Sequence, residues 1–494
     1  MTITRRRFLE WTATGAVATS AVAAACAAPG SGPDEEFGSV IVIGGGLSGL
    51  VSAYLLGGGR TRVTVLDANT HAGGRVHTER WSNDQSSELG FQEFFEENVY
   101  PDVWWLIDEL GLQDQVTRYR GSIGAYLRDE YIAPGSFSRW IRDLPWQADT
   151  DHLDFNKMAS HVSNSIGLLS MPRDEIDYAG LDTESMRDWI LRSYDQSGSG
   201  DVDWLTSIFL QPEVGVATDR TSAAYAILNL WIWYNSELFY LKDGNDQFVS
   251  RLLDRLPPES VALEAEVSNV RNLPGAGGVE VEYTDPSGRH TARADVAIVA
   301  VPHPIVSRIV PDLPADRLTA LAKLDHSRII RHNGQYSERV WETRHGFNGS
   351  GIYTDQTATW ITNSPPGEFT SGVLATYINE PAAAGLWSGS TEILTPHSLL
   401  DDAAAISVTD QLHRELAPFW PGLDSSLSEA RLWQVPYYGP VFPPRYVLDG
   451  HYALNREPFG RIHFGGDWVY GFGANDAVRR GRDVAGALAG AIRG

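Results

Sequence analysis

The sequence predicts an α/β protein of two domains, one of which is discontinuous along the chain. A strand, a glycine-rich turn, a helix and a second strand follow one another within residues 40–67, which is typical of a dinucleotide-binding unit. A glycine and an aspartate that suit the same domain lie near the other end, at Gly466 and Asp467. We therefore expect a Rossmann-like domain into which an α+β domain, a mixed sheet with helices, is inserted.

The first unit begins with a short apolar strand and three spaced glycines. Residues 40–43 read Val-Ile-Val-Ile, a β-branched run typical of a buried parallel strand. Gly44, Gly46 and Gly49 follow at a spacing that allows a tight turn and a close approach of the backbone to a ligand.

A helix and a second strand complete this unit. Residues 47–56 predict the helix, and Ser48 lies in its first turn, where backbone N–H groups attract a pyrophosphate. Residues 62–66 predict the strand, which ends at Asp67, a carboxylate suited to a ribose diol. The combination predicts dinucleotide binding.

A second glycine pair, Gly73 and Gly74, precedes Arg75 shortly after this acid. A plain nicotinamide site has no role for it. The segment resembles the FAD signature of the flavin-containing amine oxidoreductase superfamily, which includes monoamine and polyamine oxidases, L-amino-acid oxidases and phytoene-desaturase-like enzymes. The resemblance implies FAD as the cofactor, with Gly74 in the loop along it and Arg75 close to it.

The far end of the chain carries the same resemblance. In the family, the pair that matches Gly466 and Asp467 contacts the phosphate and the ribityl chain of FAD. A helix is predicted from Ala474 to about residue 492, and the resemblance places its first turn, with Ala477, at the flavin N1/C2=O edge. The chain differs from the family here, because Asn-Asp-Ala stands where Glu-Gly-Ala is usual.

Two further segments match the family between these ends. Val267 corresponds to the valine whose backbone holds the adenine, and residues 294–302 resemble the strand that closes that half of the domain. Gly90 and Phe91 belong to a segment that passes near the reactive edge of the flavin in the family.

These matches divide the chain into domains. Helical patterns dominate the first insert, as in residues 103–110 and 223–233, and strand patterns the second, as in residues 327–336 and 373–378. The prediction is a signal and tether at 1–37, an FAD-binding domain at 38–100, 235–310 and 445–494, and a substrate-binding domain at 101–234 and 311–444.

Aromatic residues near the last FAD segments are candidates for the walls of a substrate pocket. In related amine oxidases, aromatic side chains from the C-terminal loop form a cage beside the flavin. Trp433, Tyr438 and Tyr470 are the candidates here. The alternative is core packing, because a chain with 16 Trp and 19 Tyr must bury most of them structurally.

An arginine stands where many amine oxidases place a lysine near flavin N5. The family frame of a lysine, an aromatic residue and a tryptophan is matched by Arg331, Tyr336 and Trp341. Arginine stays protonated and does not readily relay a proton. Arg331 is therefore a catalytic candidate that could hold a substrate carboxylate or stabilise reduced flavin, with an ordinary strand residue as the alternative.

Three acidic residues follow the segment expected near the flavin, namely Glu93, Glu96 and Glu97. A carboxylate there could anchor the distant ammonium group of a diamine or polyamine. The alternative, which we favour, is a solvated acidic helix face. No histidine pair has the spacing of metal ligands with other ligands to support it, so we predict no metal.

The N-terminus predicts export. Arg5, Arg6 and Arg7 form a twin-arginine pattern, and the apolar stretch at 11–25 is too short for a good membrane span. Cys26 follows three alanines, which resembles a lipoprotein cleavage site, and lipidation and simple signal cleavage both stay open. We expect a periplasmic, extracellular or membrane-anchored protein.

Charge and cysteine content exclude several classes of function. The net charge of −24 argues against nucleic-acid binding. It would steer cationic substrates toward the protein, and the alternative is a solubilising surface typical of a salt-tolerant or exported protein. Because the chain has one cysteine, it forms no internal disulfide and no cysteine metal cluster.

The leading hypothesis is an exported FAD-dependent oxidase of an amine or amino acid, with hydride transfer to flavin N5 and O₂ as the acceptor, giving H₂O₂. A second hypothesis is an FAD-dependent desaturase or dehydrogenase that acts on a C–C bond of an apolar substrate. A third is a flavin-bearing partner protein without turnover.

Overall fold

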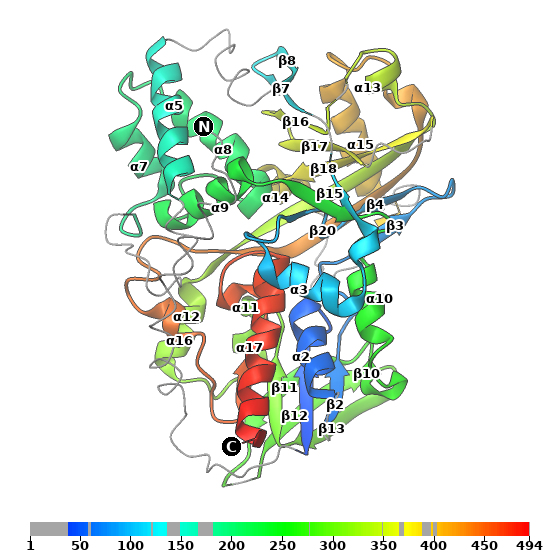
Figure 1. The fold of residues 1–494 in the computed structure, drawn as a ribbon, viewed down its shortest axis with the longest axis vertical. Coiled ribbons are helices and arrows are strands. Elements are labelled where there is room, and N and C mark those ends of the chain that lie inside the picture. The colour runs from blue at the N-terminus through cyan, green and yellow to red at the C-terminus, as the bar shows by residue number, and fades with distance from the viewer. Residues whose placement is uncertain are drawn as a thin grey trace, which may run out of the picture.

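The computed structural model describes residues 38–57, 61–119, 122–135, 149–165, 181–275, 277–347, 349–364, 370–387, 397–398 and 403–493. The predicted export segment and Cys26 lie outside the described residues. Figure 1 shows a lower half built on a parallel sheet and an upper half built on a larger sheet flanked by helices. The predicted α/β class is confirmed.

The sheet of the lower half is parallel and has β1 (Ser39–Ile43) at its centre. β2 (Arg62–Leu66) and β10 (Val261–Ala262) extend it on one side. β14 (Val296–Val299) and β21 (Ile462–Phe464) extend it on the other. Three distant parts of the chain therefore build one sheet, as expected for a discontinuous domain.

Both faces of this sheet are buried, which explains the continuous apolar run of β1. Val40 and Val42 belong to one core, shared with α2 (Leu47–Gly57) and α17 (Ala474–Arg493). Ile41 and Ile43 belong to a second core. That core also includes side chains of an antiparallel sheet made of β11 (Glu266–Asn272), β12 (Val279–Asp285) and β13 (Gly288–Ala294). Alternate residues thus pack on opposite layers.

α2 and α17 lie side by side in front of the parallel sheet (Figure 1). α3 (Pro101–Leu110) and α10 (Gln247–Leu253) pack beside them. The Asn475 side chain accepts a hydrogen bond from the Asp102 backbone N–H at 2.9 Å. The first residues of the predicted substrate-binding segment thus pack on the FAD side, and the exact domain boundaries stay a prediction.

The upper half contains an eight-stranded mixed sheet, in which only β16 and β7 pair in parallel. In spatial order its strands are β19 (His397–Ser398), β20 (Leu427–Val441), β15 (Asp325–Tyr336), β18 (Gly372–Ile378), β17 (Trp360–Ser364), β16 (Gly351–Thr354), β7 (Ile123–Leu127) and β8 (Glu130–Gly135). The strands predicted at 327–336 and 373–378 are therefore present. The long strands β15 and β20 run between the two halves in Figure 1.

Helices flank this sheet. One group, at the upper left of Figure 1, contains α5 (Asp149–Asn164), α7 (Met186–Ser193), α8 (Asp201–Val214) and α9 (Ala223–Asn235). α15 (Ala403–Leu416) packs in another core with side chains of β15 and β18. Within the described ranges, no helix has the length and apolar character needed to cross a bilayer.

Short elements complete the fold. They are β3 (Thr78–Arg80), β4 (Ser86–Glu88), β5 (Phe94–Phe95), β6 (Val116–Arg118), β9 (Leu238–Leu241), α11 (His303–Ile309), α12 (Ala315–Lys323), α13 (Val340–Thr343), α14 (Ala382–Leu386) and α16 (His451–Leu454). β5 and β6 flank β9, and this small sheet packs near the start of α3.

Candidate active site

A cavity of about 450 Å³ is lined by residues of both halves. The lower side of the cavity is lined by residues that directly follow strands of the parallel sheet. These are Gly44 after β1, Asp67 after β2, Ala300 after β14 and Gly466 after β21. The carboxyl ends of parallel strands are the usual ligand-binding edge of an open α/β sheet. From above it is walled by side chains of β15, β18 and β20.

The glycines of the first turn serve two different needs. A Cβ on Gly49 would come within 2.0 Å of the Gly44 carbonyl oxygen, so Gly49 lets the helix pack against the turn. A Cβ on Gly46 would meet no atom within 4 Å, and Gly46 lines the cavity. The backbone at Gly46 is therefore open to a ligand, whereas Gly49 is a packing residue and does not line the cavity.

Asp67 links the second strand to this turn. One carboxylate oxygen accepts the Gly45 backbone N–H at 2.6 Å, and the other accepts the Asn69 backbone N–H at 2.8 Å. The side chain is buried and borders the cavity. It therefore lies where the ribose acid of a dinucleotide site is expected.

Arg75 and Asp467 form an ion pair, with 2.7 Å between Nη2 and Oδ1. Arg75 also donates to the Tyr438 carbonyl oxygen. Burial alone would lower the pKa of Arg75, but the charge of Asp467 and their hydrogen bond outweigh it and raise the pKa. The guanidinium thus stays charged at the edge of the cavity, and it connects the two FAD motifs to β20.

The predicted cofactor-binding residues converge on this cavity. All of them except Gly49 line it: Gly44, Gly46, Ser48, Asp67, Gly74, Arg75, Gly90, Phe91, Val267, Gly466, Asp467 and Ala477.

An aromatic wall closes the upper side of the cavity. Trp433 on β20 and Tyr377 on β18 pair with the same residue, Arg331 on β15, so the three lie in one row across the sheet. Trp433, Tyr377 and Tyr438 line the cavity. The Tyr438 hydroxyl donates to the Pro212 carbonyl oxygen at 3.0 Å, which fixes the ring against α8.

Arg331 lies between Trp433 and Tyr377 in this row and is only 1% exposed. Its Nη2 donates to the Gln92 side-chain oxygen at 2.8 Å and to the Glu88 carbonyl oxygen at 3.1 Å. Its guanidinium carbon lies 3.5 Å from the centre of the Tyr377 ring. Arg331 does not line the cavity, so the structure places it as a support of the wall and of the segment after Gly90.

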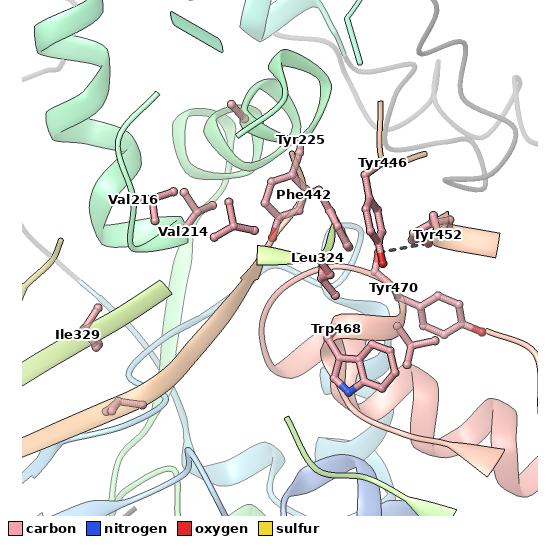
Figure 2. Close-up of a cluster of buried hydrophobic side chains, with 14 of the residues drawn as sticks. Val214, Val216, Tyr225, Leu324, Ile329, Phe442, Tyr446, Tyr452, Trp468 and Tyr470 are labelled. Carbon is pink, nitrogen blue, oxygen red and sulfur yellow. Dashed lines mark hydrogen bonds between the residues drawn. The ribbon is translucent and has the colours of Figure 1, made fainter. Parts of the chain in front are cut away.

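Tyr470, a fourth catalytic candidate, lies elsewhere and does not line the cavity. After Asp467 the chain forms a short 3₁₀ helix, Asp467–Val469, which turns the next side chain away. The Tyr470 hydroxyl donates to Asp483 at 2.6 Å, and the Arg479 guanidinium carbon lies 4.7 Å from the ring centre. Figure 2 shows Tyr470 in a buried cluster with Trp468, its hydroxyl turned away from the indole. Its expected place in the pocket is therefore corrected.

Besides Asp67, Glu266 and Asp467, two further acids line the cavity, and the sequence indicated only one of these two. Glu93 lies in the segment after Gly90, where no helix forms, so the favoured solvated helix face is not present. Burial raises the pKa of Glu93 to about 7, while the charge of Arg331 opposes the rise. Glu213 was missed, because it lies on α8, far along the chain from any motif. Burial and the charge of Glu93 raise its pKa well above the usual range.

The residues present fit FAD. The open backbone at Gly46 leaves room beside the N-terminus of α2, whose N–H groups suit a pyrophosphate. Asp67 can accept from ribose hydroxyls. Within the described residues, the buried Trp433 indole N–H has no hydrogen-bond partner, although Trp433 borders the cavity. An unpaired donor of this kind suits an acceptor atom of a bound ligand.

The fold and this cavity define a flavin-dependent oxidoreductase of two discontinuous halves. The chain belongs to the flavin-containing amine oxidoreductase family, because the model of that family matches residues 47–489. FAD is therefore the cofactor.

Three similar proteins share low sequence identity with this chain. An L-amino-acid oxidase of Bungarus fasciatus is 22% identical over 471 residues, covering 87% of this chain and 82% of the relative. A putrescine oxidase solved with bound putrescine is 19% identical, with a TM-score of 0.72 over 91% of this chain and 98% of its own. A cyclohexylamine oxidase from Brevibacterium oxydans has a TM-score of 0.70 at 19% identity, over 92% and 99% of the two chains. At these identities the solved structures establish the shared fold alone.

Proposed function

We propose that this protein oxidises an amine or an amino acid, with O₂ as the electron acceptor and H₂O₂ and an imine as products. The observation that supports it most is one cavity that joins the FAD-binding residues Gly46 and Arg75 to the aromatic wall of Trp433, Tyr377 and Tyr438. When bound, FAD supplies a hydride acceptor. The protein has to bind the donor, orient its C–H bond and exclude water.

The aromatic wall suits the first of these tasks. An amine can lose hydride only as the free base, because an ammonium nitrogen has no lone pair to form the iminium. A desolvated aromatic pocket disfavours the ammonium form. Burial also raises the pKa of Tyr377 and Tyr438, so both hydroxyls stay neutral and offer no competing negative charge near the reacting nitrogen.

Arg331 supports the wall indirectly. Its hydrogen bond to Gln92 and its position over the Tyr377 ring hold two cavity-lining side chains in place. Because a lysine would offer a single compact charge and no planar surface, the substitution is not conservative. We therefore assign Arg331 a positioning role.

Export by the twin-arginine route is the second part of the proposal. It rests on the arginine pattern at residues 5–7 and the short apolar stretch that follows. Replacing Arg5, Arg6 and Arg7 by lysine should retain the protein in the cytoplasm, as measured by fractionation. Unchanged export would remove this part and leave the enzymatic part intact.

The enzymatic part is tested by anaerobic titration of the purified flavoprotein with a panel of amines and amino acids. We expect bleaching of the flavin band by one class of amine, followed by peroxide formation when air is readmitted. Bleaching only by apolar substrates without nitrogen would instead support a C–C desaturase. Bleaching by dithionite alone would indicate a flavin-bearing protein without turnover.

A further inference from the structure

Two side chains from different halves of the protein meet at the opening of the cavity. Arg308 lies in the last turn of α11, which follows β14 of the parallel sheet, and Tyr437 lies on β20 of the larger sheet. The Arg308 guanidinium donates to the Tyr437 hydroxyl oxygen at 3.1 Å. Both side chains line the cavity, Arg308 is exposed and Tyr437 is half-buried. This hydrogen bond therefore lies where the cavity meets the solvent.

One face of α11 is turned toward the cavity. Ile305 and Ile309 lie one helical turn apart on this face and line the cavity together with Arg308. α11 also packs against β11, the strand that carries Val267, the predicted adenine contact. Arg308 is thus presented to the cavity by a helix that belongs to the FAD-binding half.

Tyr437 is held by the other half. Its ring packs against the ring of His326 on β15, with 5.2 Å between the ring centres. The next residue, Tyr438, accepts a hydrogen bond from Arg75 at its backbone carbonyl oxygen. Two adjacent residues of β20 are therefore bound by two arginines of the FAD-binding half, Arg75 and Arg308.

The same two arginines are the basic side chains among the described residues that line the cavity. The acidic residues of this lining are Asp67, Glu93, Glu213, Glu266 and Asp467. The diphosphate of FAD carries two negative charges, so acidic surroundings disfavour it unless cations lie nearby. Arg308 places a positive charge at the opening through which the cofactor enters and leaves.

We propose that Arg308 and Tyr437 form a bridge across the opening of the FAD cavity, and that this bridge retains the cofactor by slowing its release. The bridge joins the two halves of the protein, so it has to open before FAD leaves between them. Retention of this kind depends on FAD as the cofactor and not on the reaction proposed above.

The rate of FAD release from the holoenzyme tests the bridge without any turnover. The protein is diluted in the presence of a phosphodiesterase, which converts released FAD to the more fluorescent FMN and prevents rebinding. Tyr437→Phe removes only the hydroxyl and should release FAD about fivefold faster. Arg308→Met also removes a charge and should release it about tenfold faster or more. Arg308→Lys keeps a charged donor and should restore part of the retention.

A double-mutant cycle separates the bridge from two independent effects. Tyr437→Phe should accelerate release in the wild-type background and hardly change it in the Arg308→Met background. Arg251→Met is the matched control, because Arg251 is also an exposed arginine in the last turn of a seven-residue helix, α10, but does not line the cavity. The circular-dichroism spectrum of each variant identifies loss of fold.

The outcomes separate this bridge from the oxidase proposal. Wild-type release rates in both single variants, additive effects of the two substitutions, or an equal acceleration by Arg251→Met would each overturn the bridge. If no amine bleaches the flavin and the coupled acceleration is found, the oxidase fails and the bridge stands. If amines bleach the flavin and release is unchanged in the variants, the bridge fails and the oxidase stands.

Discussion

The Arg75 guanidinium donates to Asp467 at 2.7 Å, although the two residues are 392 positions apart in the chain. Both residues line the cavity, where the loop that contains Gly74 meets the segment after β21. Asp467 also accepts the backbone N–H of Gly473 at 3.2 Å, just before α17 begins. The Asp467 carboxylate thus holds both the Arg75 side chain and the backbone at Gly473, which precedes the C-terminal helix α17.

Asp467→Asn should therefore weaken FAD binding about tenfold or more, because a charge-assisted hydrogen bond is replaced by a neutral one. The ratio of flavin to protein after dialysis measures the loss. The exposed Asp449→Asn variant is a control that should retain its FAD. Full occupancy with an unchanged flavin spectrum in Asp467→Asn would contradict the assignment.

Two glycines of the first turn should respond differently to substitution. Gly46→Val adds a side chain that points into open cavity, so the protein should fold and fail to retain FAD. Gly49→Ala forces a Cβ against the Gly44 carbonyl oxygen and should lower stability by about 1–3 kcal/mol or more. Circular dichroism melts and flavin content together separate these effects. A stable Gly49→Ala protein would show that the turn can relax.

Tyr470→Phe should affect stability and leave substrate binding unchanged. The variant loses the hydrogen bond to Asp483 and keeps the ring among the arginines, which predicts a loss of about 1 kcal/mol. Tyr377→Leu is the contrasting variant, because it opens the cavity wall and should raise KM for the amine. A raised KM in Tyr470→Phe with a normal melting temperature would place Tyr470 at the substrate after all.

Glu93 should make the stability of the flavoprotein fall with rising pH. Its pKa is about 7 in the folded protein against 4.5 normally, so the folded state binds the extra proton between these values. Stability is thus full below about pH 4.5 and is lost as the pH rises through 7. Glu93→Gln should remove this loss, which is about 3 kcal/mol.

Thermal midpoints of the two proteins, measured without amine at pH 5 and pH 8, check this prediction. The thermal midpoint of the variant should exceed that of the wild type only at pH 8. A constant difference at both values would mean that Glu93 stays ionised in the folded protein.

The FAD side of the fold could be predicted because its signals are local. β1 and β2 are β-branched runs buried on both faces, and the glycine turn between them has a fixed spacing. Almost all residues predicted to contact FAD line the cavity for this reason. Gly49 was the exception, because the same motif uses it for packing against Gly44.

The residues on the substrate side of the cavity come together through contacts between elements that are far apart in the sequence. The sequence of a single strand or helix does not reveal such contacts. Glu213 borders the cavity only because α8 packs on the sheet, where Pro212 accepts a hydrogen bond from Tyr438. Tyr377 could have been found from strand register, since it pairs with Arg331, as Trp433 does. Tyr470 was misplaced because the 3₁₀ turn after Asp467 sets its direction, and aromatic content alone does not reveal such a turn.

β21 and Asp467 belong to the last part of the polypeptide, yet they complete the central sheet and the ion pair with Arg75. During synthesis, the glycine turn and β14 emerge from the ribosome before β21, the strand that pairs with β14. Loading with flavin must therefore wait until residues 462–467 have emerged, and a nonsense mutation shortly before residue 462 should yield a colourless product however well the earlier segments fold.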